Sequence, residues 1–406
     1  MGEFLHDPRV YRNAISSRRQ GHTIQVVSFT PNSFQEYSAD GIPVLNISVY
    51  ESIPPIIRDA IIAINSKYRI EYIYGYSQES ENRERIRILT QFFTQIAHFF
   101  FFMVYSNVYL YMKIRKIKGD IYYANNLPTL LAALLIARHH HAKTLYDVRE
   151  LWSDINEKTL SALRKIMNWY EKVLIHRVHA TITVNKSIAD IIQKRYRVSQ
   201  PLVVYNCPEL QEGDINPKNG HIRIIYQGRY VKNRGLENTI LSAKYLHEGK
   251  IYFRGLEDFG GGYSYRNYLE DIVKKNNLAD KVIFINPVDM KDLVISLNEY
   301  DIGIVPYQPV TLNHKYATGL KIFEYMMAGC AVAASDLPEL SKIVTECNNG
   351  VLMNPYSPED IGMKLNQLID DKNFLELCKK NSQRCSNLVY NWDIQAKKLN
   401  ALYDSL

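Results

Sequence analysis

The stretch DIGIVPYQPVTLNHKYATGLKIFEYMMAGCAVAASD, residues 301–336, decides the fold of this chain. It opens with a short apolar run after Asp301, continues through a polar loop into a helical pattern from Leu320, and ends in the apolar run 331–335. Short runs of this kind on either side of a helix predict a βαβ unit with parallel strands. Lys321 and Glu324 are three residues apart, so both project to one side of the predicted helix.

Similar apolar runs alternate with longer helical patterns along the whole chain. We predict strands at 23–28, 121–124, 144–147, 180–184, 202–205, 222–227, 250–254, 282–285, 302–305 and 331–335. The segment 201–220 is rich in proline and glycine, which predicts an interdomain linker. We therefore expect an α/β protein with two doubly wound, Rossmann-like domains facing each other across a cleft. Ligands of such sheets bind beyond the carboxyl ends of the strands.

The composition excludes a disordered chain and points to an anionic partner of the first half. Of the 406 residues, 46% are hydrophobic and 22% are charged, as in ordinary folded proteins. Residues 1–200 hold 26 Lys and Arg against 17 Asp and Glu, whereas the remainder holds 23 against 25. This asymmetry suggests contact with a membrane surface or a nucleic acid. Nucleic acid is disfavoured, because the basic residues form no motif with interleaved aromatic residues.

The cysteines predict neither a disulfide framework nor a zinc-thiolate site. Their number is odd, all lie in the second half, and no C-x-x-C pair occurs. The amino end lacks the basic start and apolar run of a secretory signal, so we expect reduced thiols in the cytoplasm. Three consecutive histidines, 139–141, point in different directions on a helix, which favours a solvated helix end over a metal site. The cysteines are Cys207, Cys330, Cys347, Cys378 and Cys385.

The segment 96–112 reads IAHFFFFMVYSNVYLYM and is mostly apolar. It is shorter than the about 20 residues of a membrane span and is interrupted by polar residues. Two interpretations stay open, a helix that docks on a membrane surface and a helix that packs into the core of the first domain. Basic residues flank the segment, which favours docking: Arg83, Arg85, Arg87, Lys113, Arg115, Lys116 and Lys118.

A second glycine-containing loop follows the predicted strand at 222–227. The sequence IIYQGRYVKNRGLE, residues 224–237, leads from this strand into a helix. Gly228 lets the backbone approach an anion, and the guanidinium groups of Arg229 and Arg234 can each bind two phosphate oxygens. With the positive amino end of the following helix, the loop is a candidate diphosphate site.

These motifs together resemble those of a known enzyme family. YQGRYVKNRGLENTI, DIGIVPY, GLKIFEYMMAG and AVAASDLPEL have the order and spacing found in the nucleotide-binding domain of the family 4 retaining glycosyltransferases of the GT-B fold. DPRVYRNA (7–14), LYDVRELWSD (145–154), ITVNKSIAD (182–190) and VVYNCPE (203–209) resemble the first domain and the crossover. The resemblance implies domains at 1–205 and 206–389, with a final helix in 390–406 that packs back on the first domain.

The resemblance implies a metal-independent hexosyltransferase that moves a sugar from a nucleoside diphosphate, UDP rather than GDP, with retention of configuration and no cofactor. Arg229 and Arg234 would neutralise the departing diphosphate, Lys321 would lie beside it, and Glu324 would hold the ribose hydroxyls. Fixed cations suit this reaction, because the leaving group gains charge in the transition state. Further donor-side residues are Gly228, Tyr307, Tyr316, Thr318, Gly319 and Leu320, and acceptor-side residues are Asp7, Arg9, Asn125, Asp147 and Glu150.

The sequence departs from the family pattern at several positions. Tyr316 stands where the family has the first Glu of its pair, Asn125 or Asn126 where a His follows the strand at 121–124, and Arg149 where the D-x-H-E motif has its His. The chain also begins at the DPRV motif, so we expect the first sheet to lack its usual first strand.

These departures keep two other functions open. One is a non-catalytic subunit that binds a sugar nucleotide or a glycan. The other is a sugar-nucleotide epimerase of the same fold, which needs acid and base carboxylates. For the transferase we expect a glycan or lipid-linked acceptor of the cell envelope, used in polysaccharide biosynthesis, and a peripheral position at the inner face of the membrane.

Overall fold

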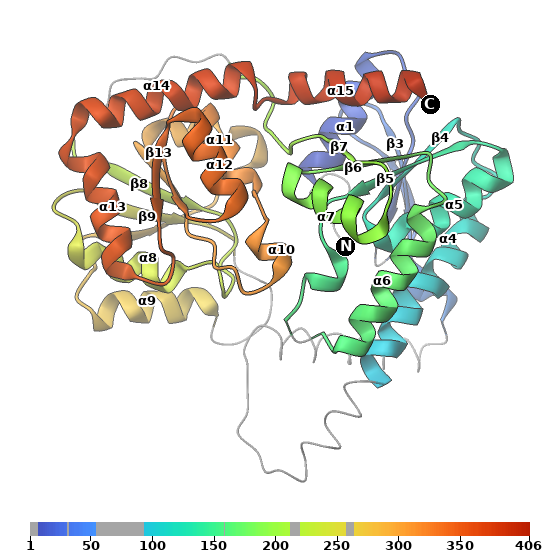
Figure 1. Cartoon of the computed structure of the whole chain (residues 1–406), viewed down its shortest axis with the longest axis horizontal. Coiled ribbons are helices and arrows are strands. Elements are labelled where there is room, and N and C mark those ends of the chain that lie inside the picture. Colours follow the sequence, from blue (N-terminus) through green and yellow to red (C-terminus); the bar gives the residue numbers. More distant parts are fainter. Residues whose placement is uncertain (1–6, 31, 54–92, 158, 212–219, 257–263) are drawn as a thin grey trace, which may run out of the picture. The chain divides into compact units, whose positions relative to one another are not determined.

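The computed structural model of the protein describes residues 7–30, 32–53, 93–157, 159–211, 220–256 and 264–406 (Figure 1). The chain forms two compact units, Met1–Val204 with Ala396–Leu406, and Tyr205–Gln395. The sequence-based division put these boundaries at 205/206 and 389/390. Part of the predicted linker, 212–219, and the basic residues Arg83, Arg85 and Arg87 lie outside the described residues.

The second unit is built around one parallel sheet with the strand order β10-β9-β8-β11-β12-β13. From β8 the chain first adds strands on one side and then returns to add the others on the opposite side, so the order reverses between β8 and β11. Four strands, β9 to β12, have the predicted bounds. The six strands are β8 (Arg223–Gln227), β9 (Lys250–Arg254), β10 (Val282–Ile285), β11 (Ile302–Val305), β12 (Ala331–Ser335) and β13 (Gly350–Met353).

Helices cover both faces of this sheet (Figure 1). Ile224 and Tyr226 of β8 belong to a core with α8, α9 and α13, whereas Ile225 belongs to a core with α11 and α12. Burial on both faces explains why β11 and β12 are continuous apolar runs. The helices of this unit are α8 (Leu236–Ser242), α9 (Tyr265–Lys275), α10 (Leu312–Lys315), α11 (Leu320–Met327), α12 (Pro338–Cys347), α13 (Pro358–Asp370) and α14 (Lys372–Leu388), with 3₁₀ turns at Ala243–Tyr245, Met290–Asp292 and Ile295–Glu299. The last helix, α15 (Trp392–Ser405), begins in this unit, and its residues from Ala396 onward belong to the first unit.

The first unit contains two sheets. One is parallel with the order β4-β5-β6-β7, and the other has the order β1-β3-β2, in which β2 is antiparallel. The sequence did not predict β2 or β3. The strands are β1 (Val26–Phe29), β2 (Phe34–Tyr37), β3 (Pro43–Ile47), β4 (Ile121–Asn125), β5 (Lys143–Val148), β6 (Ala180–Thr183) and β7 (Leu202–Val203). The helices are α1 (Pro8–Arg19), α4 (Ser106–Ile114), α5 (Leu127–His140), α6 (Ser161–Ile175) and α7 (Lys186–Tyr196), with 3₁₀ turns at Val49–Ser52 and Trp152–Asp154.

The aromatic segment 96–112 is part of one continuous helix, residues 93–114, which includes the π-helix η3 (Phe100–Tyr105) and α4. One side packs into the core through Phe99, Met103 and Leu110. Asn107, one of the polar interruptions, is buried, donates to Pro128 O at 2.8 Å and accepts from Ala132 N at 2.9 Å. The core-packing interpretation therefore holds for this side.

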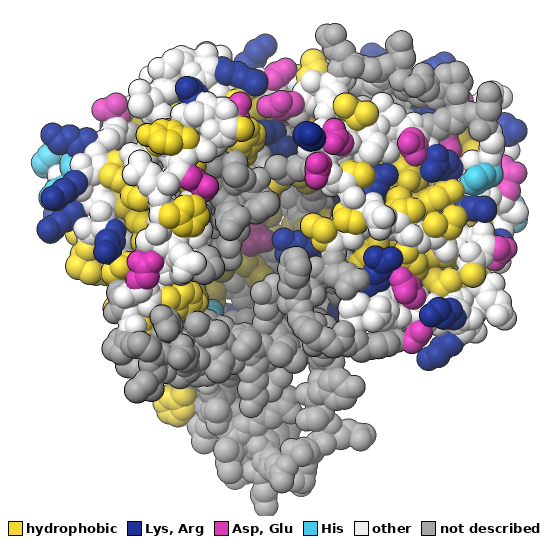
Figure 2. Space-filling model, turned by 180° about the vertical axis from the view of Figure 1, so that it is seen from behind, with side chains coloured by type: hydrophobic (Ala, Val, Ile, Leu, Met, Phe, Trp, Pro, Cys, Tyr) yellow, Lys and Arg dark blue, Asp and Glu magenta, His cyan; other side chains and the backbone are white. Residues whose placement is uncertain are grey.

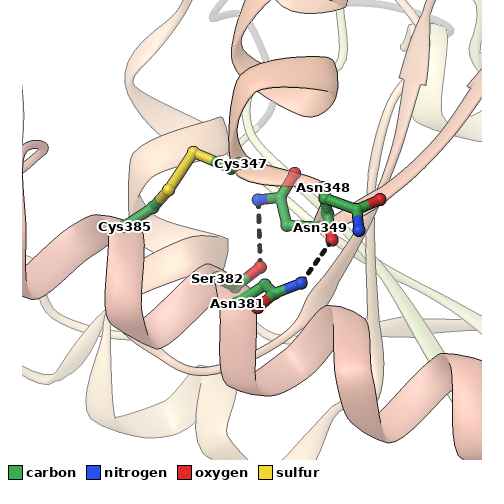
Figure 3. Close-up of a disulfide and its surroundings, with 6 residues drawn as sticks. All are labelled: Cys347, Asn348, Asn349, Asn381, Ser382 and Cys385. Atoms are coloured by element: carbon green, nitrogen blue, oxygen red, sulfur yellow. Dashed lines mark hydrogen bonds between the residues drawn. A yellow bond between two sulfur atoms is a disulfide. The ribbon is translucent and has the colours of Figure 1, made fainter.

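The prediction that the cysteines form no disulfide is wrong for one pair. Cys347, at the end of α12, is bonded to Cys385 of α14, and their Cα atoms are 6.0 Å apart (Figure 3). Two hydrogen bonds link the same segments, from Asn349 Nδ2 to Ser382 Oγ at 3.1 Å and from Asn381 Nδ2 to Asn348 O at 2.7 Å. Helix packing brings together two cysteines 38 residues apart, which their spacing in the sequence does not reveal.

A buried ion pair connects α1 to β5 in the first unit. Arg9 donates to both carboxylate oxygens of Asp147, at 2.6 and 3.0 Å, and to Val204 O at 2.7 Å. Tyr123 donates to Asp147 Oδ2 at 2.7 Å. Both charged side chains are at most 1% exposed, so neither is on the surface.

Replacing Arg9 by Met should destabilise the protein by about 3 to 5 kcal/mol, because the substitution leaves the Asp147 carboxylate buried without its cation. Denaturant-induced unfolding of the first unit measures this loss. The double variant Arg9→Met/Asp147→Leu should recover part of it, and Arg138→Met, at an exposed arginine of α5, is the control. A loss below about 1 kcal/mol for Arg9→Met would contradict a structural role of the pair.

Candidate functional site

The predicted donor-side residues gather where the strand order of the second unit reverses. Gln227 ends β8 and Gly228 follows it, while Tyr307 follows the neighbouring strand β11. Helix α11 begins at Leu320, and its first amide groups have no acceptor within the helix. In open parallel sheets, the carboxyl ends of strands at such a reversal are the usual ligand site.

A buried ammonium group lies at the centre of this site. Lys321 of α11 is 8% exposed, and its Nζ lies 4.0 Å from the ring centre of Tyr226 and 5.1 Å from that of Tyr307. Within the described part of the chain it forms no ion pair with a carboxylate. Burial, reinforced by the charge of Arg234, lowers the pKa of Lys321 well below its usual value, although Glu324 opposes this shift. An anion bound here would stabilise the charged form.

A second cation lies close to the first. The guanidinium carbon of Arg234 is 4.6 Å from the ring centre of Tyr307, so both cations share this aromatic side chain. Arg234 is half-buried in the loop between β8 and α8. Two cations held together on aromatic faces suit a ligand with more than one negative charge.

Two predicted glycines are required by the close packing around these cations. Gly228 has φ 146°, and a Cβ there would lie 2.9 Å from Lys321 Nζ. Gly319 has φ 72°, and a Cβ there would lie 2.4 Å from the hydroxyl of Tyr307. Side chains at either position would displace Lys321 or Tyr307, so both glycines serve the geometry of the site.

Glu324 lies one turn after Lys321 on α11 and is 8% exposed. Its Oε2 accepts a hydrogen bond from Gln227 Nε2 at 3.3 Å. The Gln227 side chain also accepts from Arg254, at the end of β9. Hydrogen bonds through the Gln227 side chain therefore connect the Glu324 carboxylate to Arg254 on the neighbouring strand.

The other predicted donor-side residues have different positions. Arg229 is exposed, and its carbonyl oxygen accepts from the hydroxyl of Tyr226. Thr318 is buried before α11, and Leu320 is the first residue of that helix. Tyr316 ends the short helix α10 and lies against Lys315, whose Nζ is 5.7 Å from its ring centre.

Four residues of this region were not predicted from the sequence. Tyr226, Gln227 and Arg254 belong to strands, where they resemble ordinary strand residues. His314 has a buried Nδ1 with no hydrogen-bond partner among the described residues, and burial followed by the charge of Arg234 lowers its pKa to about 4. A polar residue at the last position of a strand was the available signal for Gln227 and Arg254.

The predicted acceptor-side residues belong to the first unit. Asp7 caps the start of α1 and pairs with Arg149, whose Nη2 donates to it at 3.1 Å. Burial acts to raise the pKa of Asp7, but Arg149 and the backbone amides of Val10 and Arg9 outweigh it, so the pKa is lowered. Arg9 and Asp147 form the buried pair described above, in which each side chain is at most 1% exposed. Glu150, next to Arg149, is half-buried.

Asn125 ends β4, and its buried Oδ1 has no hydrogen-bond partner in the described structure. Asn126 follows with φ 67° and accepts from Arg149 N at 3.1 Å. Unpaired buried polar atoms are rare, so Asn125 is the acceptor-side residue best suited to contact a ligand.

No group of three or more His, Cys, Asp or Glu among the described residues is arranged to hold a metal ion. His139 and His140 instead contact Tyr111 and Tyr122 near the end of α5. Among all the residues that the structure describes, no helix is both long enough and apolar enough to cross a membrane.

Several solved structures have a similar fold. Sucrose-phosphate synthase from Thermosynechococcus elongatus has a TM-score of 0.71 at 15% identity, covering 98% of this chain and 92% of that one. The α,α-trehalose-phosphate synthase from Burkholderia vietnamiensis has a TM-score of 0.66 at 9% identity, covering 97% of each chain. HepE from Anabaena, solved with UDP, has a TM-score of 0.59 at 15% identity, covering 74% of this chain and 82% of that one. These likenesses show the fold.

Two relatives in Methanocaldococcus jannaschii are named as uncharacterized glycosyltransferases. One is 24% identical over 274 residues, which are 62% of this chain and 65% of the relative. The other is 21% identical over 252 residues, which are 58% of this chain and 60% of that relative. The alignments thus span somewhat less than two thirds of each relative.

Two family profiles together cover most of the chain. The profile described as "Glycosyl transferases group 1" matches residues 209–385. The profile described as "Glycosyltransferase Family 4" matches residues 9–211, half of the 406-residue chain. With its two Rossmann-like domains of the GT-B fold, the chain belongs to glycosyltransferase family 4.

Proposed function

We propose that this protein transfers a hexosyl group from a nucleoside diphosphate donor to a glycan or lipid-linked acceptor, with retention of configuration. The observation that carries the proposal is Lys321, a buried ammonium group at the reversal of the strand order, with Arg234 beside it and no carboxylate ion-paired to it among the described residues. A bound diphosphate would supply the missing negative charge. UDP is the ligand named for the similar HepE and TarM structures, and we propose a UDP-sugar for this chain as well.

The proposed chemistry uses the cations of the protein itself. The bond between the anomeric carbon and the diphosphate breaks, and the leaving group gains negative charge next to Lys321 and Arg234. A hydroxyl oxygen of the acceptor bonds to the same carbon, and its proton would pass to the departing phosphate oxygen. Preorganised cations in a water-poor site stabilise this charge without further rearrangement. We therefore propose that no divalent metal takes part. Glu324 would accept hydrogen bonds from the ribose hydroxyls, and Arg229 would reach the diphosphate from the exposed end of its loop.

A sugar-nucleotide-binding subunit without turnover remains the second candidate. This candidate is favoured by Tyr316, which stands where the family has a carboxylate. The Tyr316 side chain is half-buried and lies beside Lys315. Released UDP distinguishes the two functions, because only the transferase produces it.

Replacing Lys321 or Arg234 by Ala should lower turnover roughly tenfold to a hundredfold, because each loses charge-assisted bonds of about 1.5 to 3 kcal/mol to the leaving group. Glu324→Ala should mainly weaken donor binding. The measurements are released UDP in a donor screen with and without a lipid acceptor, and calorimetry for affinity. Lys232→Ala, at an exposed cation of the same loop, should behave as the wild type.

Wild-type turnover of the Lys321 and Arg234 variants would contradict the assignment of the diphosphate site. Nucleotide affinity unchanged by Glu324→Ala would contradict the ribose contact alone. Binding of a UDP-sugar by the wild type without any UDP release, across the acceptors offered, would favour the binding subunit.

We also propose that the first unit docks on an anionic membrane surface, where a lipid-linked acceptor would reach it. The helix 93–114 leaves one side exposed, with Phe93 at 67% and Phe100 at 55%. Trp169 of α6 is 65% exposed. It lies next to Tyr170, whose hydroxyl donates to Met103 O of the helix 93–114, so α6 packs beside that helix. Figure 2 shows hydrophobic, Lys and Arg side chains exposed on the surface of both units.

The charge of this region fits an anionic surface. Four exposed basic side chains follow the aromatic segment, and none forms an ion pair with a described carboxylate: Lys113, Arg115, Lys116 and Lys118. Each Lys or Arg near an anionic bilayer contributes about 1 kcal/mol of attraction. Aromatic side chains at the headgroup level would add apolar contact.

Binding to anionic liposomes should fall when these four residues are replaced by Gln, and should weaken as salt rises, because the attraction is electrostatic. Phe100→Ser should weaken binding at every salt concentration. Co-sedimentation with phosphatidylserine vesicles is the measurement. The control removes the same charge from exposed lysines of the second unit: Lys274, Lys275, Lys372 and Lys380. Equal loss in both four-residue variants, or no binding of the wild type at low salt, would contradict the docking surface.

A further inference from the structure

A buried arginine ends the strand next to β8. Arg254 is 5% exposed, and its Nη1 donates to Ser296 Oγ and, at 3.2 Å, to Gln227 Oε1. Its Nη2 lies 3.3 Å from the hydroxyl of Tyr300, and its guanidinium carbon is 5.3 Å from the centre of that ring. Every one of these partners is neutral.

Arg254 forms no ion pair with a carboxylate in the described part of the chain, and its buried Nε has no hydrogen-bond partner there. Burying a guanidinium group without an anion is costly, so a nearby negative charge is expected to compensate it. The carboxylate that its hydrogen bonds reach is Glu324, through a single side chain, that of Gln227.

The parallel sheet places Gln227 and Arg254 side by side, and Gln227 in turn contacts Glu324. Gln227 and Arg254 are partners in the parallel register of β8 and β9, and each is the last residue of its strand. Gln227 Nε2 then donates to Glu324 Oε2 at 3.3 Å. The backbone of Gln227 is fixed as well, because its N donates to the hydroxyl of Tyr325 at 2.8 Å.

The charges at the two ends determine how the Gln227 amide is oriented. Its oxygen faces the cation of Arg254 and its NH₂ group faces the carboxylate of Glu324. The reversed amide would place oxygen against carboxylate and NH₂ against guanidinium, which offers no hydrogen bond at either end. In this orientation the amide donates to Glu324, and the hydrogen bond favours one orientation of the carboxylate.

We propose that Arg254 and Gln227 are positioning residues that hold the carboxylate of Glu324 in the orientation needed to accept hydrogen bonds from the donor ribose. This inference rests on the proposed function, in which Glu324 contacts those hydroxyls. Neither residue touches the donor in this account. Their effect is on the selectivity of the site for ribose.

The test compares two ligands that differ by one hydroxyl group, UDP and 2′-deoxy-UDP, together with the matching guanine pair, GDP and 2′-deoxy-GDP. Calorimetry on the full chain gives the affinity of each. The wild type should bind the ribonucleotide of its preferred base at least about tenfold more tightly than the deoxy form, since a hydrogen bond to a carboxylate is charge-assisted. In Arg254→Met this ratio should fall to within about twofold, with the affinity for the deoxy form unchanged.

Two further variants distinguish the loss of Glu324 positioning from a general destabilisation of the fold. Gln227→Met breaks the connection but leaves Arg254 with Ser296 and Tyr300, so it should also lose the ribose selectivity. Arg223→Met is the matched control. Arg223 lies at the opposite end of β8, its guanidinium carbon is 4.8 Å from the centre of the same Tyr300 ring, and its ion pair is with Glu299. This variant should keep the selectivity even where it lowers the melting temperature.

The outcomes distinguish this inference from the function on which it rests. If the wild type prefers the ribonucleotide and both Arg254→Met and Gln227→Met keep that preference, the positioning role is wrong and the donor site stands. If Arg223→Met loses selectivity to the same extent, the effect is structural and the inference is also wrong. If the wild type binds neither nucleotide pair, the proposed function itself is contradicted.

Discussion

The site depends on one constraint, an ammonium group that is buried without an ion-paired carboxylate. Lys321 lies against the rings of Tyr226 and Tyr307, and Arg234 shares the second ring. Desolvation and the second cation both disfavour its charged form, which a bound anion would restore. Burying this group costs stability, which is the observation on which the proposed anion site rests.

The parallel sheet explains how this constraint is met. The strand order reverses between β8 and β11, and the loops that follow these two strands carry the glycine, the arginine and the tyrosine around Lys321. Gly228 and Gly319 leave the space that Lys321 and Tyr307 occupy. On the other side of β8, Arg254 and Gln227 connect the neighbouring strand to Glu324. In the proposed function, the cations for the diphosphate and the carboxylate for the ribose would thus come from one end of one sheet.

The sequence predicted the parts of the fold that have the strongest pattern. Strands β9 to β12 have the predicted bounds because a strand buried in a parallel sheet is a continuous apolar run. Strand β2 was missed because it lies at an edge and is mostly exposed, so it has no such run. Lys321, Arg234 and Glu324 were singled out through their motifs, and the structure places them at the reversal of the strand order. Arg254 was missed, because its only signal in the sequence is a polar residue at the end of a strand, and its connection to Gln227 follows from the register of the two strands. The Cys347–Cys385 disulfide was missed because it joins helices that only tertiary packing brings together.

Proton uptake on nucleotide binding tests the central claim most directly. If a diphosphate supplies the charge that Lys321 lacks, binding should raise the pKa of this lysine, and a proton should enter the site. Calorimetry of UDP binding at several pH values from about 7 to 9, in buffers of different ionisation enthalpy, measures the number of protons taken up, and uptake appears where the pH lies between the free and the bound pKa of Lys321. The terminal phosphate of UDP, with a pKa of about 6, is already largely deprotonated over this range. The account predicts net uptake of protons by the wild type and none by Lys321→Met. Zero uptake by the wild type, or the same uptake by both proteins, would contradict it.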